Sequence, residues 1–424
     1  FLSSQIRSVA MLLSGLISRM IKKGSLTLIH ADGTRTRFGD GGEPSATIRL
    51  HDKHLERRLA FNPALRVPEA YMEGQLTLEE GTDLRTFLEL IARNWSSLEA
   101  QPLYQGVNHL LRQGRRLKQF NPIGKARQNV AHHYDLSGAL YDRFLDPDRQ
   151  YSCAYFKHPQ VSLEQAQYDK KQHLASKLLL DRPGLKTLDI GSGWGGLGLY
   201  LAKETGCDVT GVTLSVEQHK LSQQRAADMQ LQDRCRFKLE DYRNETGPFD
   251  RIVSVGMFEH VGKANYDEFF GKLRDLLADD GVCVIHSIGR FDQPSPINPF
   301  IRKYIFPGAD VPSLSEVTTA VEKSGLFTTD IEILRLHYAE TLRHWYERFQ
   351  AQRDKVAELY DERFCRMWEM YLAGCEMGFR HQGLMVFQIQ LTKRLDALPL
   401  TRDYMFEWER ERAHLRTEQA DAAE

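Results

Sequence analysis

The stretch LDIGSGWGG, residues 188–196, decides the fold of this chain because it sets four glycines between two apolar segments. The residues LKTLDIG (185–191) have the character of a buried strand, and WGGLGLYLAKET (194–205) has the spacing of a helix. Glycine permits a tight turn between them and lets the backbone approach a ligand closely. This order predicts the first unit of an α/β sheet that binds its ligand at the strand ends.

The same alternation continues through the C-terminal part of the chain. The further elements we expect are strands at 207–214, 249–256 and 281–289, helices at 215–229 and 266–279, late strands at 327–336 and 385–393, and long helices between about 339 and 380. Strands that alternate with helices predict a doubly wound parallel sheet covered by helices. Residues 136–424 are therefore predicted to form one Rossmann-like α/β domain.

Two smaller parts precede this domain. Residues 1–110 are predicted to form a small α+β domain, because three segments rich in β-branched residues (25–31, 34–39 and 46–52) precede a helical region at 53–96. Residues 111–135 are predicted to form a basic linker or cover helix. No acidic residue lies between Glu99 and Asp135, and the six basic residues there are Arg112, Arg115, Arg116, Lys118, Lys125 and Arg127. This stretch either binds anionic lipid headgroups or is a solvated face.

The opening residues FLSSQIRSVAMLLSGLISRM (1–20) resemble a signal peptide only superficially, because Arg7 and Ser14 interrupt them and no cleavage site follows. Their apolar residues recur at helical spacing: Leu2, Ile6, Val9, Leu13, Leu16 and Met20. We expect an amphipathic helix that either packs on its own domain or lies on a membrane surface. Because the first residue is Phe1, we expect the natural N-terminus to lie upstream.

The overall composition excludes several classes of protein. The net charge is 56 − 57 = −1, which gives no electrostatic signal for nucleic acid. The six cysteines form no CxxC or Cys/His spacing, so we expect no metal site and read the thiols as reduced in a cytosolic compartment. No stretch reaches about 18 uncharged apolar residues, so we expect no membrane-spanning segment.

The glycine pattern alone leaves two cofactors open. Gly191, Gly193 and Gly196 satisfy G-x-G-x-x-G, which occurs in sites for NAD and for S-adenosylmethionine. An NAD site needs an acidic residue at the end of the second strand to bind the ribose hydroxyls. Thr213 and Leu214 stand at that position. The sequence therefore disfavours NAD.

Two further features favour S-adenosylmethionine. Asp189 directly precedes the glycines, where a carboxylate can order the loop and face a cationic amino-acid group. Asp241 and Tyr242, in EDYR (240–243), lie between the strands expected at 207–214 and 249–256, and we expect them near a bound adenine. Together these features predict a class I methyltransferase.

The chain also resembles a known family. The segments that carry the likeness, in order between about residues 115 and 395, include HHYDLSGALYDRFLDPDRQYSCAYF, LDIGSGWGGLGLYLA, GVTLSVEQ, DRIVSVGMFEHVG, IHSIG, YIFPG, LHYAETLRHWYERF and YLAGCEMGFR. They are similar to the cyclopropane-fatty-acyl-phospholipid synthases, of the cyclopropane and mycolic acid synthase family. The N-terminal part likewise resembles the lipid-contacting domain of bacterial members.

The resemblance implies a reaction. The methyl of S-adenosylmethionine is transferred to a cis double bond of an acyl chain in a membrane phospholipid. The resulting cation loses a proton from the added methyl to a bound bicarbonate, and a cyclopropane closes. The family also implies a homodimer. We expect it in the cytoplasm, associated peripherally with the inner membrane and its phospholipid bilayer surface, through a contact that is sensitive to salt because it is partly electrostatic.

The resemblance also implies the site residues. Those that match the family's bicarbonate pocket are Cys153, Glu259, His286, Ile288 and Tyr338. His286, Tyr338 and the main chain at Cys153 and Ile288 are expected to donate hydrogen bonds to the anion. Cys375 matches another family cysteine and is a weak candidate, because a reactive thiolate would compete for the methyl. Packing is the alternative role for Cys153, His286, Tyr338 and Cys375, and for Glu259 the alternative is a helix N-terminal carboxylate.

Further positions are predicted to contact the cofactor. They are Tyr151, Ser152, Asp189, Gly191, Gly193, Trp194, Gly195, Thr213, Leu214, Gln218, Tyr242 and Arg243. The segment YSCAYF (151–156) would then be a lid over the site.

Three rival functions remain at this stage. The first is an enzyme of the same fold that leaves a methyl or methylene branch on the fatty acid. The second is a small-molecule N-methyltransferase, some of which share the FEH motif. The third is a lipid-binding protein without catalytic activity. The basic stretch and the complete pocket favour the synthase.

Overall fold

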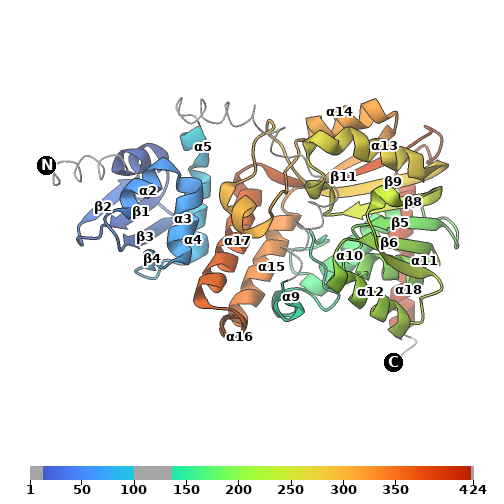
Figure 1. Ribbon diagram of the computed structural model, residues 1–424, viewed down its shortest axis with the longest axis horizontal. Coiled ribbons are helices and arrows are strands. Elements are labelled where there is room, and N and C mark those ends of the chain that lie inside the picture. Colours follow the sequence, from blue (N-terminus) through green and yellow to red (C-terminus); the bar gives the residue numbers. More distant parts are fainter. Residues whose placement is uncertain (1–12, 100–135, 422–424) are drawn as a thin grey trace. The chain divides into compact units, whose positions relative to one another are not determined.

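The computed structural model describes residues 13–99 and 136–421, and its chain divides into two compact units (Figure 1). The first unit contains residues 1–115, 295–307 and 339–384, and the second contains the remainder. The predicted domains were continuous in sequence, whereas these units are not, because the last two segments pack with the N-terminal residues. The predicted basic linker at 111–135 lies outside the described residues.

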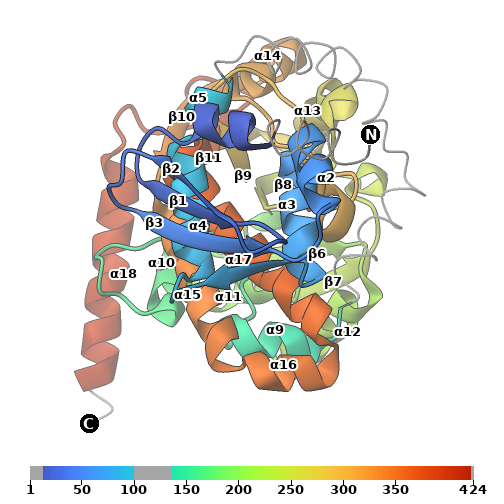
Figure 2. The same cartoon turned by 90° about the vertical axis from the view of Figure 1, so that its left-hand side faces the viewer.

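The first unit contains a four-stranded sheet of order β2-β1-β3-β4 (Figure 2). Its elements are β1 (Ser25–Ile29), β2 (Arg35–Gly39), β3 (Ser45–Leu50), α2 (Leu55–Phe61), α3 (Pro63–Met72), β4 (Leu76–Glu79), α4 (Leu84–Arg93) and α5 (Trp95–Glu99). The three predicted strands are confirmed. The four-residue strand β4 interrupts the region predicted as helical, since it pairs antiparallel with β3.

Two further parts of the first unit complete its packing. Residues 13–20 are helical, with Leu13, Ile17 and Met20 buried, so this part of the opening helix packs on its own unit. The later segments supply η4 (Ile301–Ile305), most of α15 (His337–Ala351), α16 (Arg353–Leu359) and α17 (Glu362–His381). Helix α17 packs on α3 and α4, where the buried Glu376 carboxylate accepts two hydrogen bonds from Arg85.

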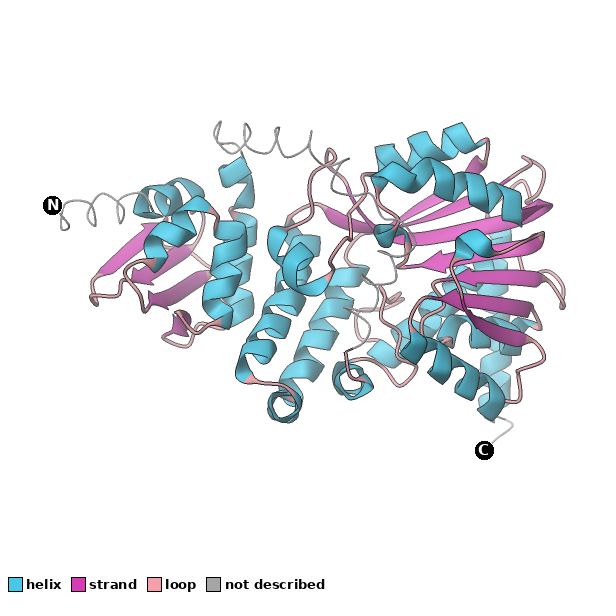
Figure 3. Ribbon diagram, viewed as in Figure 1, coloured by secondary structure: helices cyan, strands magenta, loops and turns pink. Residues whose placement is uncertain are grey.

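The second unit is built on a seven-stranded sheet of order β10-β11-β9-β8-β5-β6-β7 (Figure 3). The strands are β5 (Lys186–Ile190), β6 (Asp208–Thr213), β7 (Cys235–Leu239), β8 (Phe249–Val255), β9 (Leu277–Arg290), β10 (Phe327–Leu334) and β11 (Leu384–Thr392). The pairs from β7 to β9 are parallel, and β10 runs antiparallel to β11. The predicted α/β fold is confirmed, with an antiparallel edge that was not predicted.

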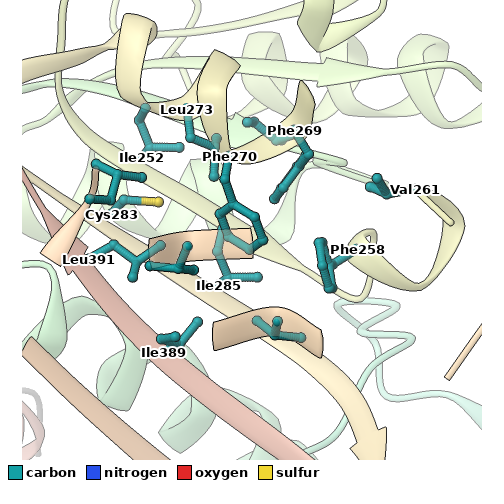
Figure 4. Close-up of a cluster of buried hydrophobic side chains, with 14 of the residues drawn as sticks. Ile252, Phe258, Val261, Phe269, Phe270, Leu273, Cys283, Ile285, Ile389 and Leu391 are labelled. Atoms are coloured by element: carbon teal, nitrogen blue, oxygen red, sulfur yellow. The ribbon is translucent and has the colours of Figure 1, made fainter. Parts of the chain in front are cut away.

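Helices cover both faces of this sheet. They are α9 (Gly138–Phe144), α10 (Leu163–Lys177), α11 (Gly196–Thr205), α12 (Val216–Asp228), α13 (Tyr266–Leu276), α14 (Leu314–Ser324) and α18 (Asp403–Asp421), with short turns η1 (Tyr242–Asn244), η2 (Phe258–His260) and η3 (Lys263–Asn265). One core joins the sheet to α13 and α14 and includes Ile252, Phe269, Phe270 and Ile285 (Figure 4). A second core joins the other face to α10 and α11. None of the described helices is long and apolar enough to cross a membrane.

The strand order creates the binding position. From β5, the chain runs to β6 and β7 on one side and to β8 and β9 on the other. A crevice opens at such a switch point, at the carboxyl ends of the strands. The loops after β5, β6, β7 and β8 all end at this edge of the sheet.

Candidate active site

A pocket occupies this switch point. Most of its lining comes from the loops after these four strands and from residues 149–152. Eleven of the twelve predicted cofactor residues line it: Tyr151, Ser152, Asp189, Gly191, Gly193, Trp194, Thr213, Leu214, Gln218, Tyr242 and Arg243. Lining residues that were not predicted include Lys170, Met257 and His260. The sequence therefore located the pocket through its glycine loop and strand ends.

Gly195 is the exception, because it is not among the described residues that line the pocket. Its φ is +85°, and a Cβ there would lie 2.7 Å from Cζ of Phe237 and 2.9 Å from Cβ of Ser222. Both neighbours belong to the interior of the second unit. Gly195 therefore serves close packing and the turn into α11, and the expectation that it contacts the cofactor is not supported by its position.

Gly191 and Gly193 serve the pocket itself. Gly191 has φ +81°, and a Cβ there would lie 2.8 Å from Cβ of Met257, another lining residue. Gly193 has φ +54° and no atom within 4 Å of a built Cβ. The backbone at Gly193 is therefore open to a ligand.

The end of β6 carries hydroxyl and amide groups. The Oγ1 of Thr213 donates to Oε1 of Gln218 at 2.9 Å, and Ser215 caps α12. No carboxylate stands at this strand end, which agrees with the argument against NAD. After β7, Asp241 accepts hydrogen bonds from Nε and Nη2 of Arg243 at 2.9 and 2.8 Å. This fixes Arg243 beside the Tyr242 ring.

Residues 149–152 close one side of the pocket. The ring of Tyr151 packs edge-on against Tyr141 of α9 at 5.5 Å, and Tyr141 contacts Trp194 in the same way at 4.9 Å. Helix α10 also contacts this segment, because Nε2 of its Gln167 donates a hydrogen bond to the carbonyl of Ser152 at 2.9 Å. The beginning of YSCAYF thus forms a wall of the pocket, as the lid hypothesis requires.

Asp189 places a buried acid in this pocket. Its Oδ2 has no hydrogen-bond partner among the described residues. Burial raises the pKa of Asp189 to about 7, although the Lys170 charge opposes this shift. A cationic ligand group would stabilise the ionised carboxylate. S-adenosylmethionine carries an ammonium and a sulfonium, so the residues present fit this cofactor.

Two of the predicted catalytic residues, Glu259 and His286, lie in elements that adjoin the pocket. Glu259 is in η2, after β8, and His286 is in β9. His286 pairs with the lining residue Val255 across the two strands, and its carbonyl accepts from the amide of Gly256 at 2.9 Å. This pairing brings β9 directly beside the pocket.

Glu259 is a buried carboxyl group with one occupied oxygen. Its Oε1 accepts from the amide of Ile288 at 2.7 Å, whereas Oε2 has no partner within the part of the chain that the structure describes. Burial raises the pKa of Glu259 to about 7. The Ile288 N–H thus donates to Glu259 in this structure, and its expected donation to a bound anion stays a prediction.

His286 is a neutral, fixed imidazole. Its Nδ1 lies 3.1 Å from Nε2 of Gln388, an amide donor, so Nδ1 accepts and the ring proton is assigned to Nε2. Burial, followed by the charges of Lys170 and Lys177, lowers the pKa of His286 well below its ordinary value. The Nε2–H can therefore donate a hydrogen bond to an anion without carrying a charge.

The other candidate catalytic residues are Cys153, Tyr338 and Cys375. Cys153 is buried, with its Sγ 3.3 Å from the carbonyl of Ala154, and Tyr338 is buried at the start of α15. Cys375 belongs to α17 of the first unit. Burial raises the pKa of the Cys375 thiol to about 12, so it is protonated at neutral pH and is a poor nucleophile.

Comparison with known proteins identifies the class and then the family. The model described as mycolic acid cyclopropane synthetase matches residues 123–389, and one described as a domain of unknown function matches residues 13–101. A probable fatty acid methyltransferase of Pseudomonas putida is 37% identical over 388 residues, covering 87% of this chain and 94% of the relative. The cyclopropane-fatty-acyl-phospholipid synthase of Escherichia coli K12 is 36% identical over 365 residues, covering 86% and 92%.

A solved structure agrees with these relatives. The mycolic acid cyclopropane synthase CmaA1, complexed with SAH and CTAB, has a TM-score of 0.60 and 34% identity, covering 64% of this chain and 99% of that one. The fold and the pocket are those of an S-adenosylmethionine-dependent methyltransferase. Within this class, the chain belongs to the mycolic acid cyclopropane synthetase family.

Proposed function

We propose that this enzyme converts cis double bonds in the acyl chains of membrane phospholipids into cyclopropane rings, with a bound bicarbonate as the base. The relative from E. coli, named for this activity, supports the choice of acceptor. We also propose that the enzyme is a homodimer in the cytoplasm and meets the inner membrane peripherally. Its phospholipid substrate lies in that surface, and the basic stretch of residues 111–135 would provide an electrostatic contact.

The proposed chemistry balances without a protein nucleophile. S-adenosylmethionine supplies an electrophilic methyl and leaves as S-adenosylhomocysteine. The π electrons of the alkene form the new C–C bond, and the second carbon becomes a cation. A proton then leaves the added methyl for bicarbonate, and the released electron pair closes the ring. Since an alkene is a weak nucleophile, alignment with the methyl has to provide much of the acceleration.

The observation that carries the role of an anionic base is the unpartnered Oε2 of Glu259. Bicarbonate carries a hydroxyl that can donate to this oxygen, while the Nε2–H of His286 can donate to another bicarbonate oxygen. A buried, unpartnered acceptor is costly, and a hydroxyl donor would relieve that cost. The Ile288 amide holds the Glu259 carboxylate in place.

Product analysis tests the proposal. The purified enzyme is incubated with S-adenosylmethionine, bicarbonate and vesicles of monounsaturated phospholipid, and the fatty acids are analysed by mass spectrometry and proton NMR. We expect a gain of one CH2 and ring-proton signals. Replacing Glu259→Gln should lower the rate while leaving cofactor binding intact, and omission of bicarbonate should lower it in the same way. No mass gain, with cofactor still bound, would refute a lipid acceptor.

A second candidate is a fatty acid C-methyltransferase that leaves a methyl or methylene branch. The P. putida relative, which carries the name probable fatty acid methyltransferase, favours it. The two candidates share the cofactor and the acceptor and differ in how the cation is quenched. Olefinic methylene protons in place of ring protons would select this candidate.

A further inference from the structure

Helix α10 places one unusual lysine against the pocket. Lys170 is 1% exposed, and its Nζ donates to Oε1 of Gln150 at 2.6 Å and to Oγ of Ser152 at 2.8 Å. Both acceptors are neutral, and no carboxylate of the described residues forms an ion pair with Nζ. The other two buried lysines of α10 are paired, Lys171 with Asp148 and Lys177 with Glu332. Lys170 is therefore a buried cation without a contacting anion.

The same pocket contains a buried acid without a contacting cation. Asp189 is 2% exposed, and its Oδ2 lacks a partner in residues 13–99 and 136–421. Lys170 and Asp189 both line the pocket, yet they do not form an ion pair with each other. A buried ammonium without a contacting anion and a buried carboxyl group without a contacting cation are both costly to fold. A ligand that carries both signs close together would satisfy both.

We propose that Lys170 binds the α-carboxylate of S-adenosylmethionine while Asp189 binds its α-ammonium, so that the pair selects the zwitterionic end of the cofactor. An ammonium has three donors, and two of them hold Gln150 and Ser152. The third is available for the carboxylate, so Lys170 links the cofactor to the pocket wall at 149–152. The proposal rests on the methyltransferase activity and not on the identity of the acyl acceptor.

Calorimetric titration of the full chain with two ligands tests this role. The ligands are S-adenosylmethionine and its decarboxylated analogue, which keeps the sulfonium and the ammonium. Because a charge-assisted hydrogen bond is lost, Lys170→Met should weaken the binding of S-adenosylmethionine on the order of 10- to 100-fold. The affinity of the Lys170→Met enzyme for the decarboxylated analogue should stay unchanged. The control is Lys171→Met, which removes the neighbouring lysine; that residue pairs with Asp148 and does not line the pocket. This variant should keep the preference of the enzyme for S-adenosylmethionine over the decarboxylated analogue.

Two results would overturn the proposal. If Lys170→Met loses affinity equally for both ligands, or for neither, Lys170 only supports residues 149–152. Equal affinity of the unmodified enzyme for the two ligands would also exclude carboxylate recognition, and this measurement needs no variant. The titrations contain no lipid, so their outcome is independent of whether phospholipid is the acceptor.

Discussion

The contrast between Gly195 and Gly193 gives a prediction that separates folding from cofactor binding. Both residues have positive φ, +85° and +54°, so alanine meets a similar backbone cost of about 1–2 kcal/mol at each. Only at Gly195 would the added Cβ collide, with Phe237 at 2.7 Å and Ser222 at 2.9 Å. Overpacking of this kind costs a further ~1–3 kcal/mol. Gly195→Ala should therefore be less stable than Gly193→Ala by that amount.

Thermal unfolding and calorimetric titration together check this prediction. For units of 150–250 residues, 1 kcal/mol corresponds to roughly 2–4 °C in Tm. We expect Gly195→Ala to lower Tm by several degrees more than Gly193→Ala does. At a temperature where both variants are folded, Gly193→Ala should weaken the binding of S-adenosylmethionine more than Gly195→Ala does, because Gly193 lines the pocket. A Gly195→Ala protein with unchanged Tm and lost cofactor binding would refute the reasoning and restore Gly195 as a contact.

Three further predictions concern titratable groups. Burial raises the pKa of Glu259 from 4.5 to about 7, so the folded state binds an extra proton between these pH values and loses stability as pH rises through them. In urea unfolding, Glu259→Gln should remove roughly 2–3 kcal/mol of the resulting fall in the free energy of unfolding between pH 5 and 8. The pKa of Glu332 is shifted in the opposite direction. Burial alone would raise this pKa, but hydrogen bonds from His173 and Lys177 outweigh burial and lower it. The stability that Glu332 contributes is therefore lost as pH falls. Glu332→Gln should therefore destabilise the protein at neutral pH more than at pH 3, and a constant difference across the range would contradict the ion-pair account. Cys375→Ala should keep methyl transfer within about twofold, because its thiol is protonated at neutral pH; a loss of activity without a loss of Tm would restore the thiol as a catalytic group.

The fold could be predicted largely from local patterns. Alternating strands and helices around LDIGSGWGG specify the sheet, because each signal lies within about twenty residues of sequence. Helix α14 was not among the predicted elements, although Ser313 and Glu316 form a capping box before an apolar run and could have revealed it. Strand β4 is too short to give a periodic signal in the sequence. Its position is fixed instead by pairing with β3.

The site could be predicted only in part. Its glycines, strand ends and the FEH segment are visible in sequence, because the sheet brings consecutive loops to one edge. The burial of Lys170 is not visible, because α10 contains polar residues on every side and its sequence, LEQAQYDKKQHLASK, looks solvent-exposed. The engagement of the Ile288 amide by Glu259 is a contact between β9 and η2, which no local pattern encodes. The packing of residues 295–307 and 339–384 with the N-terminal residues is likewise a long-range property.

The most direct test of the central claim follows the transferred methyl with a deuterium label. The enzyme is supplied with S-adenosylmethionine carrying a fully deuterated methyl, bicarbonate and monounsaturated phospholipid vesicles, and the product is examined by mass spectrometry and NMR. Ring closure predicts that the added carbon loses one deuterium and that the remaining two lie on a cyclopropane carbon. An added carbon that keeps all its deuterium as a methyl branch would contradict the account, and so would a label found on an olefinic carbon.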